Sequence, residues 1–256
     1  MSLVVHSARR GVGRSQIAAN LAALLAAMGS RVGLVDGQSE QSGGPGLEDF
    51  SPAEVRQRWW RYLGGGLALP DLAWEVRPRL WLLPAVLWHA WLAPPRSPMG
   101  EPGAFQQCLG ELVAALALDW LIVESGSGLG EEALLALAAA EALVVVVRPD
   151  AQEVQATAVL LALAEQLGVG WRWLVVNQAP AGRSRALRQA FARAYRMPVA
   201  TVLPLVPELA AWHGDGFFAL AQPTHPWSMG LRELLATVQR AGGWRGLAER
   251  GGGHDP

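Results

Sequence analysis

The sequence predicts an α/β protein with a mostly parallel central sheet flanked by helices on both faces. Short apolar runs alternate along the chain with longer segments of helical periodicity, which is the pattern of parallel strands joined by helices. Several of these runs end in an acidic or amide residue, at the edge where such sheets bind ligands. A glycine-rich loop follows the first apolar run, in the position of a phosphate-binding loop.

Size and composition favour one large domain. The chain has 256 residues, of which 51% are hydrophobic, enough to bury a substantial core. We expect a single domain over residues 1–241, followed by a flexible tail over residues 242–256, where glycines gather at 242–243 and 251–253.

Net charge argues against general nucleic-acid binding, and the cysteine content excludes a disulfide-stabilised fold. The formal net charge is −1, so no general basic field for nucleic acid exists, and all 21 basic residues are arginine. The single cysteine, Cys108, excludes an intramolecular disulfide and fits a reducing compartment. The first apolar run is too short for a signal peptide, and the longest uncharged runs fall short of a membrane span. We therefore expect a soluble, cytoplasmic protein.

Each element follows from its local pattern. The first strand covers residues 3–5, a helix-patterned run reaches Met28, and a second strand over residues 31–35 ends at Asp36 before a polar loop at 37–44. Later strands are expected at residues 79–83, 121–123, 142–147, 171–176 and 199–203. Later helices are expected at residues 52–63, 105–118, 130–140, 151–167, 184–195 and 227–238.

The loop between the first strand and the first helix has the residues of a phosphate site. Gly11 and Gly13 allow backbone N–H groups to close on phosphate oxygens, and Ser15 offers a hydroxyl at the helix start for Mg²⁺. Arg14 stands where the P-loop pattern has a lysine, and a planar guanidinium is not equivalent to a compact ammonium there. From these residues alone, a glycine turn flanked by surface arginines is the alternative.

The wider pattern resembles a known family. The run from Arg9 to Ser15, followed by Ala19-Asn20-Leu21-Ala22, is similar to the deviant Walker A loop of the MinD/ParA ATPases, and further family motifs occur in order to about residue 235. The resemblance implies a P-loop NTPase fold that binds ATP or ADP with Mg²⁺ and forms a nucleotide-bridged homodimer. The residues that it assigns to the phosphates are Arg10, Gly11, Val12, Gly13, Arg14, Ser15 and Gln16.

The resemblance also implies metal and catalytic residues. Asp36 matches the first Asp of the switch region, and Gln38 stands at the second, the one associated with hydrolysis. Glu124 ends a strand at the Walker B position, one methylene longer than the family's Asp. Ser15, Asp36 and Glu124 are thus the expected metal ligands, and Asp36, Gln38 and Arg9 the expected catalytic group. Arg9 occupies the position of the lysine that reaches the partner's phosphates. An amide such as Gln38 orients water but accepts no proton.

Two residues are candidates for the adenine base. Asn177, which follows a strand, matches the family's base-reading Asn, and its side chain has both the donor and the acceptor that an adenine edge requires. Pro204 lies in a loop similar to the one that backs the adenine. A polar turn residue at a strand end is the alternative interpretation of Asn177.

An arginine cluster, the tryptophans and an apolar stripe near residue 235 each have both a structural and a functional interpretation. Five arginines gather around the helix expected at 184–195: Arg183, Arg185, Arg188, Arg193 and Arg196. They are interpreted as a solvated helix face, and the alternative is a contact surface for DNA or anionic lipid. Most of the tryptophans at positions 59, 60, 74, 81, 88 and 91 are expected to be core or half-buried. Adjacent Trp59 and Trp60 cannot both face the core of one helix, so one of them is a candidate for a contact surface. The apolar stripe of Leu231, Leu234, Leu235 and Val238 is expected to be core, not a membrane anchor.

Two functions remain open from the sequence. The first is a nucleotide-responsive dimerising switch that positions cellular machinery, as the resemblance implies. The second is a pseudo-ATPase that serves as a scaffold or regulatory subunit. Arg10, Arg14, Gln38 and Glu124 depart from the family's pattern and favour weak or absent hydrolysis, while Gly11, Gly13, Ser15, Asp36 and Asn177 favour retention of the pocket.

Overall fold

A computed structural model of the chain describes all residues except 37–51, 84–101, 211, 213–215 and 242–256. The expected loop at 37–44, the residue Gln38 and the tail at 242–256 therefore lie outside the described residues.

The described strands form one eight-stranded sheet in the order β3-β4-β2-β5-β1-β6-β7-β8. All neighbouring strands pair in parallel except β3 with β4, which is antiparallel. The strands are β1 (Ser2–His6), β2 (Val32–Val35), β3 (Trp74–Arg77), β4 (Leu80–Leu83), β5 (Trp120–Glu124), β6 (Ala142–Val147), β7 (Trp171–Ala179) and β8 (Val199–Pro204). The predicted mostly parallel α/β fold is confirmed.

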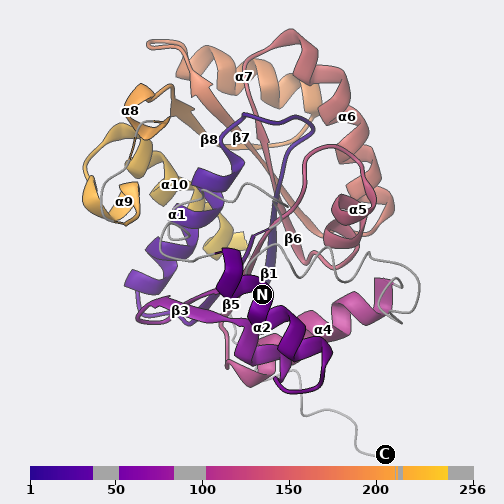
Figure 1. Cartoon of the computed structure of the whole chain (residues 1–256). Helices are drawn as coiled ribbons and strands as arrows, with labels where there is room; N and C mark the ends of the chain where they lie inside the picture. The colour runs from indigo at the N-terminus through magenta and orange to yellow at the C-terminus, as the bar shows by residue number, and fades with distance from the viewer. Residues whose placement is uncertain (37–51, 84–101, 211, 213–215, 242–256) are drawn as a thin grey trace, which may run out of the picture.

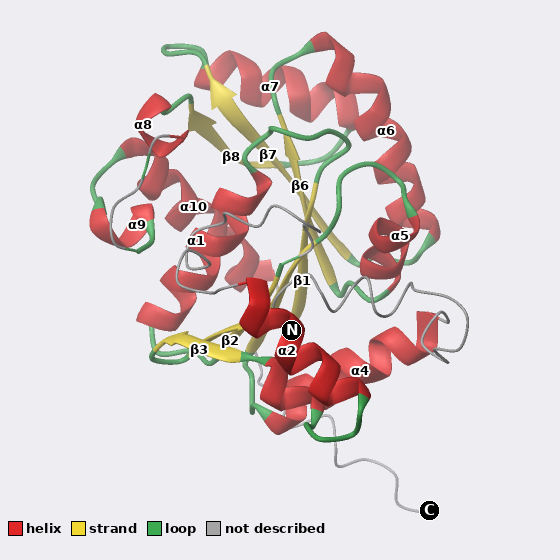
Figure 2. Cartoon of the chain, viewed as in Figure 1, coloured by secondary structure: helices red, strands yellow, loops and turns green. Residues whose placement is uncertain are grey.

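Helices cover both faces of the sheet (Figures 1 and 2). They are α1 (Arg14–Ala27), α2 (Pro52–Leu63), α4 (Pro102–Ala115), α5 (Glu131–Ala138), α6 (Ala151–Gln166), α7 (Ser184–Tyr195), α8 (Pro207–Ala210), α9 (Phe218–Ala221) and α10 (Pro226–Ala241), with a 3-10 turn η1 (Leu69–Leu72) before β3. The helices expected at 52–63 and 184–195 have the predicted bounds.

Alternation of side chains along the strands divides the core into two clusters. Val144 and Val146 point into a cluster with α1 and α10, whereas Val145 and Val147 point into a cluster with α4, α5, α6 and α7. Strand β6 is fully buried along its length, as its unbroken apolar run predicts.

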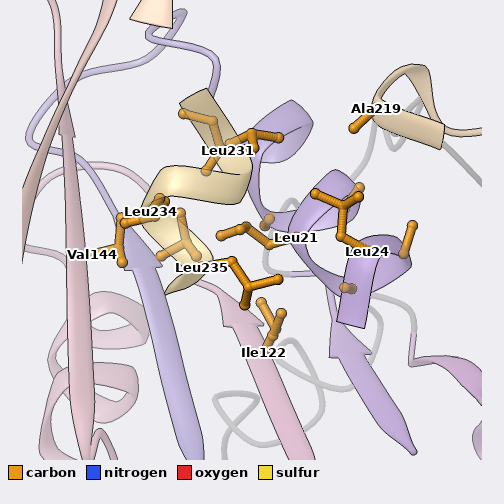
Figure 3. Packing of buried hydrophobic residues seen from close by; sticks show 14 of the residues in the cluster. Leu21, Leu24, Ile122, Val144, Ala219, Leu231, Leu234 and Leu235 are labelled. Carbon is orange, nitrogen blue, oxygen red and sulfur yellow. The ribbon is translucent and has the colours of Figure 1, made fainter. Parts of the chain in front are cut away.

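Helix α10 packs on the sheet through the stripe predicted from its sequence. Leu231 and Leu234 have no exposed surface, and Leu235 and Val238 are at most 4% exposed. Figure 3 shows Leu231, Leu234 and Leu235 between the strands and Leu21 of α1. Burial of this stripe confirms the expectation of a core helix. No helix in the described part of the chain is both long and apolar enough to cross a membrane.

The described tryptophans between residues 59 and 91 are half-buried or exposed: Trp74 and Trp81 are half-buried, and Trp60 on α2 is 69% exposed. Elsewhere Trp120, Trp173 and Trp227 are buried, whereas Trp171 is 48% exposed. The side chain of Trp59 lies outside the described part of the chain.

Candidate functional site

The glycine-rich loop joins β1 to α1, and its backbone needs glycine at two positions. Gly11 and Gly13 have φ angles of 76° and 86°, in the left-handed region that L side chains rarely adopt. Gly13 also caps the N-terminus of α1, and a Cβ atom there would collide with the side-chain amide of Asn177. The loop therefore directs the start of α1, with its N–H groups and positive dipole end, toward the sheet edge.

Arg14 does not extend away from the protein but folds into it. Its side chain is only 6% exposed, and its Nε donates to Glu124 Oε1 at 3.2 Å. Its Nη1 donates to Ser7 Oγ at 2.8 Å, and Ser7 in turn donates to the Arg9 carbonyl. The guanidinium fork thus joins the loop to the end of β5, an arrangement that a single ammonium could not make.

Ser15 and Glu124, two of the expected metal ligands, bond to each other. Ser15 Oγ donates to Glu124 Oε1 at 2.6 Å, the same oxygen that accepts from Arg14. Glu124 pairs in register with Val5 across β1 and β5, so its side chain starts directly beside the loop. The extra methylene of Glu relative to Asp is accommodated by this reach across to α1.

Asp36 comes directly after β2, which lies between β4 and β5 in the sheet. It is 5% exposed, and its backbone N–H donates to the Leu83 carbonyl at 2.9 Å. The parallel strands bring Asp36 to the same edge as Glu124. Within the described residues, no three His, Cys, Asp or Glu side chains come together as a metal cluster.

A buried histidine lies beneath the loop. His6 ends β1, has no exposed surface, and its Nδ1 hydrogen-bonds Ser125 Oγ. Burial, and then the Arg14 guanidinium, lower the pKa of His6 from 6.5 to about 4. His6 is therefore neutral at pH 7. His6 was not predicted as a site residue, although a histidine at the end of a buried strand is unusual.

Asn177 and Gln178, at the end of β7, brace the loop from the other side. Asn177 Nδ2 donates to the Val12 carbonyl at 2.8 Å, and Gln178 Nε2 donates to the Gly11 carbonyl at 2.9 Å. Trp227 Nε1 on α10 donates to Asn177 Oδ1 at 3.4 Å. Both ends of the Asn177 amide are thus engaged inside the protein. Gln178 and Trp227 were not predicted, because contacts so distant in sequence leave no local pattern.

Arg9 and Arg10, the two consecutive arginines of the loop, differ in their contacts. Arg9 Nη1 donates to Gln152 Oε1 at 2.7 Å, near the N-terminus of α6, whose N-cap is Asp150. Arg10 is exposed and, within the described residues, makes no side-chain hydrogen bond or ion pair. Pro204 ends β8, which is the last strand in the sheet order, and so lies at the same edge formed by the C-terminal ends of the strands. Most of the predicted site residues that the structure describes therefore lie on or beside one edge, with Arg14, Ser15 and Glu124 in direct contact.

A buried acid lies next to this edge on α6. Glu153 has no exposed surface, and burial raises the pKa of its carboxyl, partly offset by Arg148 and Arg9. Its Oε1 lies 3.8 Å from Arg148 Nε, and in the described part of the chain neither oxygen accepts a hydrogen bond. The contribution of Arg9 places this carboxyl within the electrostatic reach of the loop.

Fold and loop together define the class: a P-loop protein of the MinD/ParA type. Residues 1–208 match the family model described as cellulose biosynthesis protein BcsQ. The chain belongs to that family, within the wider MinD/ParA group that the sequence resembles.

Solved structures show the same fold. MinD of Aquifex aeolicus superposes with a TM-score of 0.74 at 18% identity, covering 95% of this chain and 97% of that one. MinD of Pyrococcus horikoshii complexed with Mg-ADP superposes with a TM-score of 0.73 at 19% identity, covering 94% and 97%. At these identities the likeness establishes the fold alone.

Two curated proteins are similar in sequence. An ATP-binding protein of Methanocaldococcus jannaschii, otherwise uncharacterised, is 23% identical over 93% of this chain and 87% of its own length. The flagellum site-determining protein YlxH of Helicobacter pylori is 28% identical over 58% of this chain and 48% of its own length.

Proposed function

We propose that the protein binds ADP or ATP at the loop between β1 and α1 and acts as a nucleotide-responsive, dimerising switch or scaffold. The observation that carries this proposal is the meeting of Gly13, Ser15 and Glu124 at one sheet edge, with Asp36 directly after the neighbouring strand β2. The left-handed glycines and the start of α1 provide N–H groups for phosphate oxygens.

The relatives support adenine nucleotide and a positioning role. One curated relative is described as ATP-binding, one neighbouring structure contains Mg-ADP, and another relative is a site-determining protein. The family description adds a cargo class, because its members are cellulose biosynthesis proteins. We propose that the cargo is cellulose-synthesising machinery.

Hydrolysis is proposed to be very slow or absent. The Arg14 guanidinium is held by Glu124 and Ser7 and so is not aimed at a terminal phosphate. Gln38, at the position associated with hydrolysis, has an amide that accepts no proton from an attacking water. Both features weaken the stabilisation of charge that phosphoryl transfer requires.

A second candidate is a scaffold that works without nucleotide. Its support is the internal pairing of the site: Asn177 bonds Val12 and Trp227, and Glu124 bonds Arg14 and Ser15. Residues that satisfy one another need no ligand to be stable.

Calorimetric titration with ATP, beside a phosphate-release assay, separates these functions. The main proposal expects saturable binding with one site per chain and no measurable phosphate release. Turnover comparable to that of ordinary ATPases of this class would contradict slow hydrolysis. An absence of heat for both ATP and ADP would leave the nucleotide-independent scaffold.

A further inference from the structure

Two of the three residues that would hold Mg²⁺, Ser15 and Glu124, do not fit a metal ion as they are arranged. Mg²⁺ requires near-ideal octahedral geometry from oxygen ligands that are free to turn toward it. Glu124 Oε1 instead accepts from Ser15 Oγ at 2.6 Å and from Arg14 Nε at 3.2 Å. The hydroxyl proton of Ser15 therefore lies between the two expected ligands, and the Arg14 guanidinium bonds the same carboxylate oxygen.

The cation in this cluster is already supplied by the protein. Arg14 and Glu124 are each 6% exposed, so the pair is shielded from solvent and its attraction is stronger than at the surface. Arginine stays protonated at every physiological pH and is less strongly hydrated than an ammonium, which suits it to a buried pair. Entry of Mg²⁺ would displace this cation and leave a buried guanidinium without its carboxylate, which is strongly unfavourable.

A second observation concerns the charge available for phosphates. The loop contains Arg9, Arg10 and Arg14, whereas the family's Lys-Gly-Gly-Val-Gly-Lys loop has glycine where Arg10 stands. Arg10 is exposed and makes no ion pair with any described residue. Its guanidinium can meet two phosphate oxygens at once, which supplies to the anion the positive charge that a metal ion would otherwise bring.

We propose that Arg14 takes the place of Mg²⁺ at this site, so that the protein binds nucleotide phosphate without a divalent metal. Arg14 holds Glu124, which in turn accepts from Ser15, and Arg10, with the N-terminus of α1, neutralises the phosphates. This inference rests on the proposed nucleotide binding and assigns its cation.

The first test is titration with ADP in excess Mg²⁺ and again in excess EDTA. The proposal expects that Mg²⁺ does not tighten binding by more than about twofold. Binding at least about tenfold tighter with Mg²⁺ would overturn this inference but leave nucleotide binding intact. No ADP binding in either buffer would overturn both.

Arg14→Lys tests the residue directly. One ammonium cannot hold Glu124 and Ser7 in the fork geometry of arginine, so Glu124 is released toward a metal. The variant is expected to bind ADP at least about tenfold more tightly with Mg²⁺ than with EDTA. Arg193→Lys, on the exposed part of α7, is the matched control and should behave as the unaltered protein. An Arg14→Lys variant that folds and stays independent of Mg²⁺ would contradict the role of Arg14.

A direct metal measurement needs no variant. Mn²⁺, as a paramagnetic substitute for Mg²⁺, is titrated into the protein with ADP and followed by electron paramagnetic resonance. The proposal expects no bound Mn²⁺ beyond the amount that ADP binds alone. A protein-dependent Mn²⁺ signal at one site per chain would overturn it.

Discussion

At the residue scale, the buried pair of Arg14 and Glu124 joins the start of α1 to the end of β5. The sequence placed both residues at the sheet edge but gave them separate roles, at phosphate and at metal. Their direct contact at 3.2 Å was not predictable, because Arg14 and Glu124 lie 110 positions apart and rotamers leave no sequence pattern. The loop glycines were predictable, because only glycine fits their backbone angles.

Glu124→Gln should destabilise the fold. The change removes the charge that compensates the buried Arg14 guanidinium, and the loss of one partner of a buried pair costs about 3 kcal/mol. Urea denaturation at pH 7 measures the free energy of unfolding. Glu165→Gln is the control, because Glu165 is 74% exposed and faces Arg172 at 3.8 Å. If both variants unfolded at the same urea concentration, the buried pair would not contribute to stability.

His6 should make the protein sensitive to acid. Its folded pKa of about 4 lies below the unfolded value of 6.5, so the unfolded chain takes up the proton first as the pH falls. Stability from this group is complete above pH 6.5 and is lost toward pH 4, a decrease of about 3 kcal/mol. The measurement is urea denaturation of the protein and of His6→Asn at pH 7 and near pH 4.5. Parallel pH dependence in the two proteins would exclude His6 as the source.

At the element scale, two amphipathic helices and the buried strand β6 were predicted with the bounds that the structure has. Helices α2 and α7 have the bounds that their patterns indicated, since proline or serine marks each start. Strand β3 was missed, because it has only the residues Trp74–Arg77 and alternates between half-buried and exposed positions. Its antiparallel pairing with β4 at the sheet edge gives it a place that its own sequence does not specify.

Helix α10 should act as core and not as a surface anchor. Leu231→Ala removes a side chain with no exposed surface that faces α1 and the sheet, and should cost about 3 kcal/mol of the free energy of unfolding. Met229→Ala, at a position 58% exposed on the same helix, should change stability by less than about 0.5 kcal/mol. Thermal and urea unfolding of both variants is the measurement. A similar small effect for Leu231→Ala would argue that α10 is not docked on the domain.

At the scale of the whole molecule, the parallel sheet gathers residues from distant parts of the chain at one edge. Residues 15, 36, 124 and 177 come from separate strand–helix units, and their common edge was predictable because the C-terminal ends of parallel strands coincide. Which of these residues bond one another was not predictable from the sequence, because those contacts depend on how the strand–helix units pack together.

Nucleotide should also control association. Arg9 bonds Gln152 within its own chain, and we expect it to leave that amide for the phosphates of a partner's nucleotide. ATP should therefore shift the protein from monomer to dimer, and Arg9→Ala should abolish the shift without unfolding the chain. Light scattering with and without ATP measures it, with Arg193→Ala as a control. A protein that remains monomeric in saturating ATP would contradict the bridged dimer.

Calorimetric titration with ADP shows whether the arginine-rich loop binds adenine nucleotide. One saturable site per chain is expected in the unaltered protein. Arg10→Glu, which reverses an exposed charge of the loop, should weaken binding by at least about tenfold, whereas Arg193→Glu on α7 should leave it unchanged. No saturable binding, or equal loss in both variants, would contradict a nucleotide site at this loop.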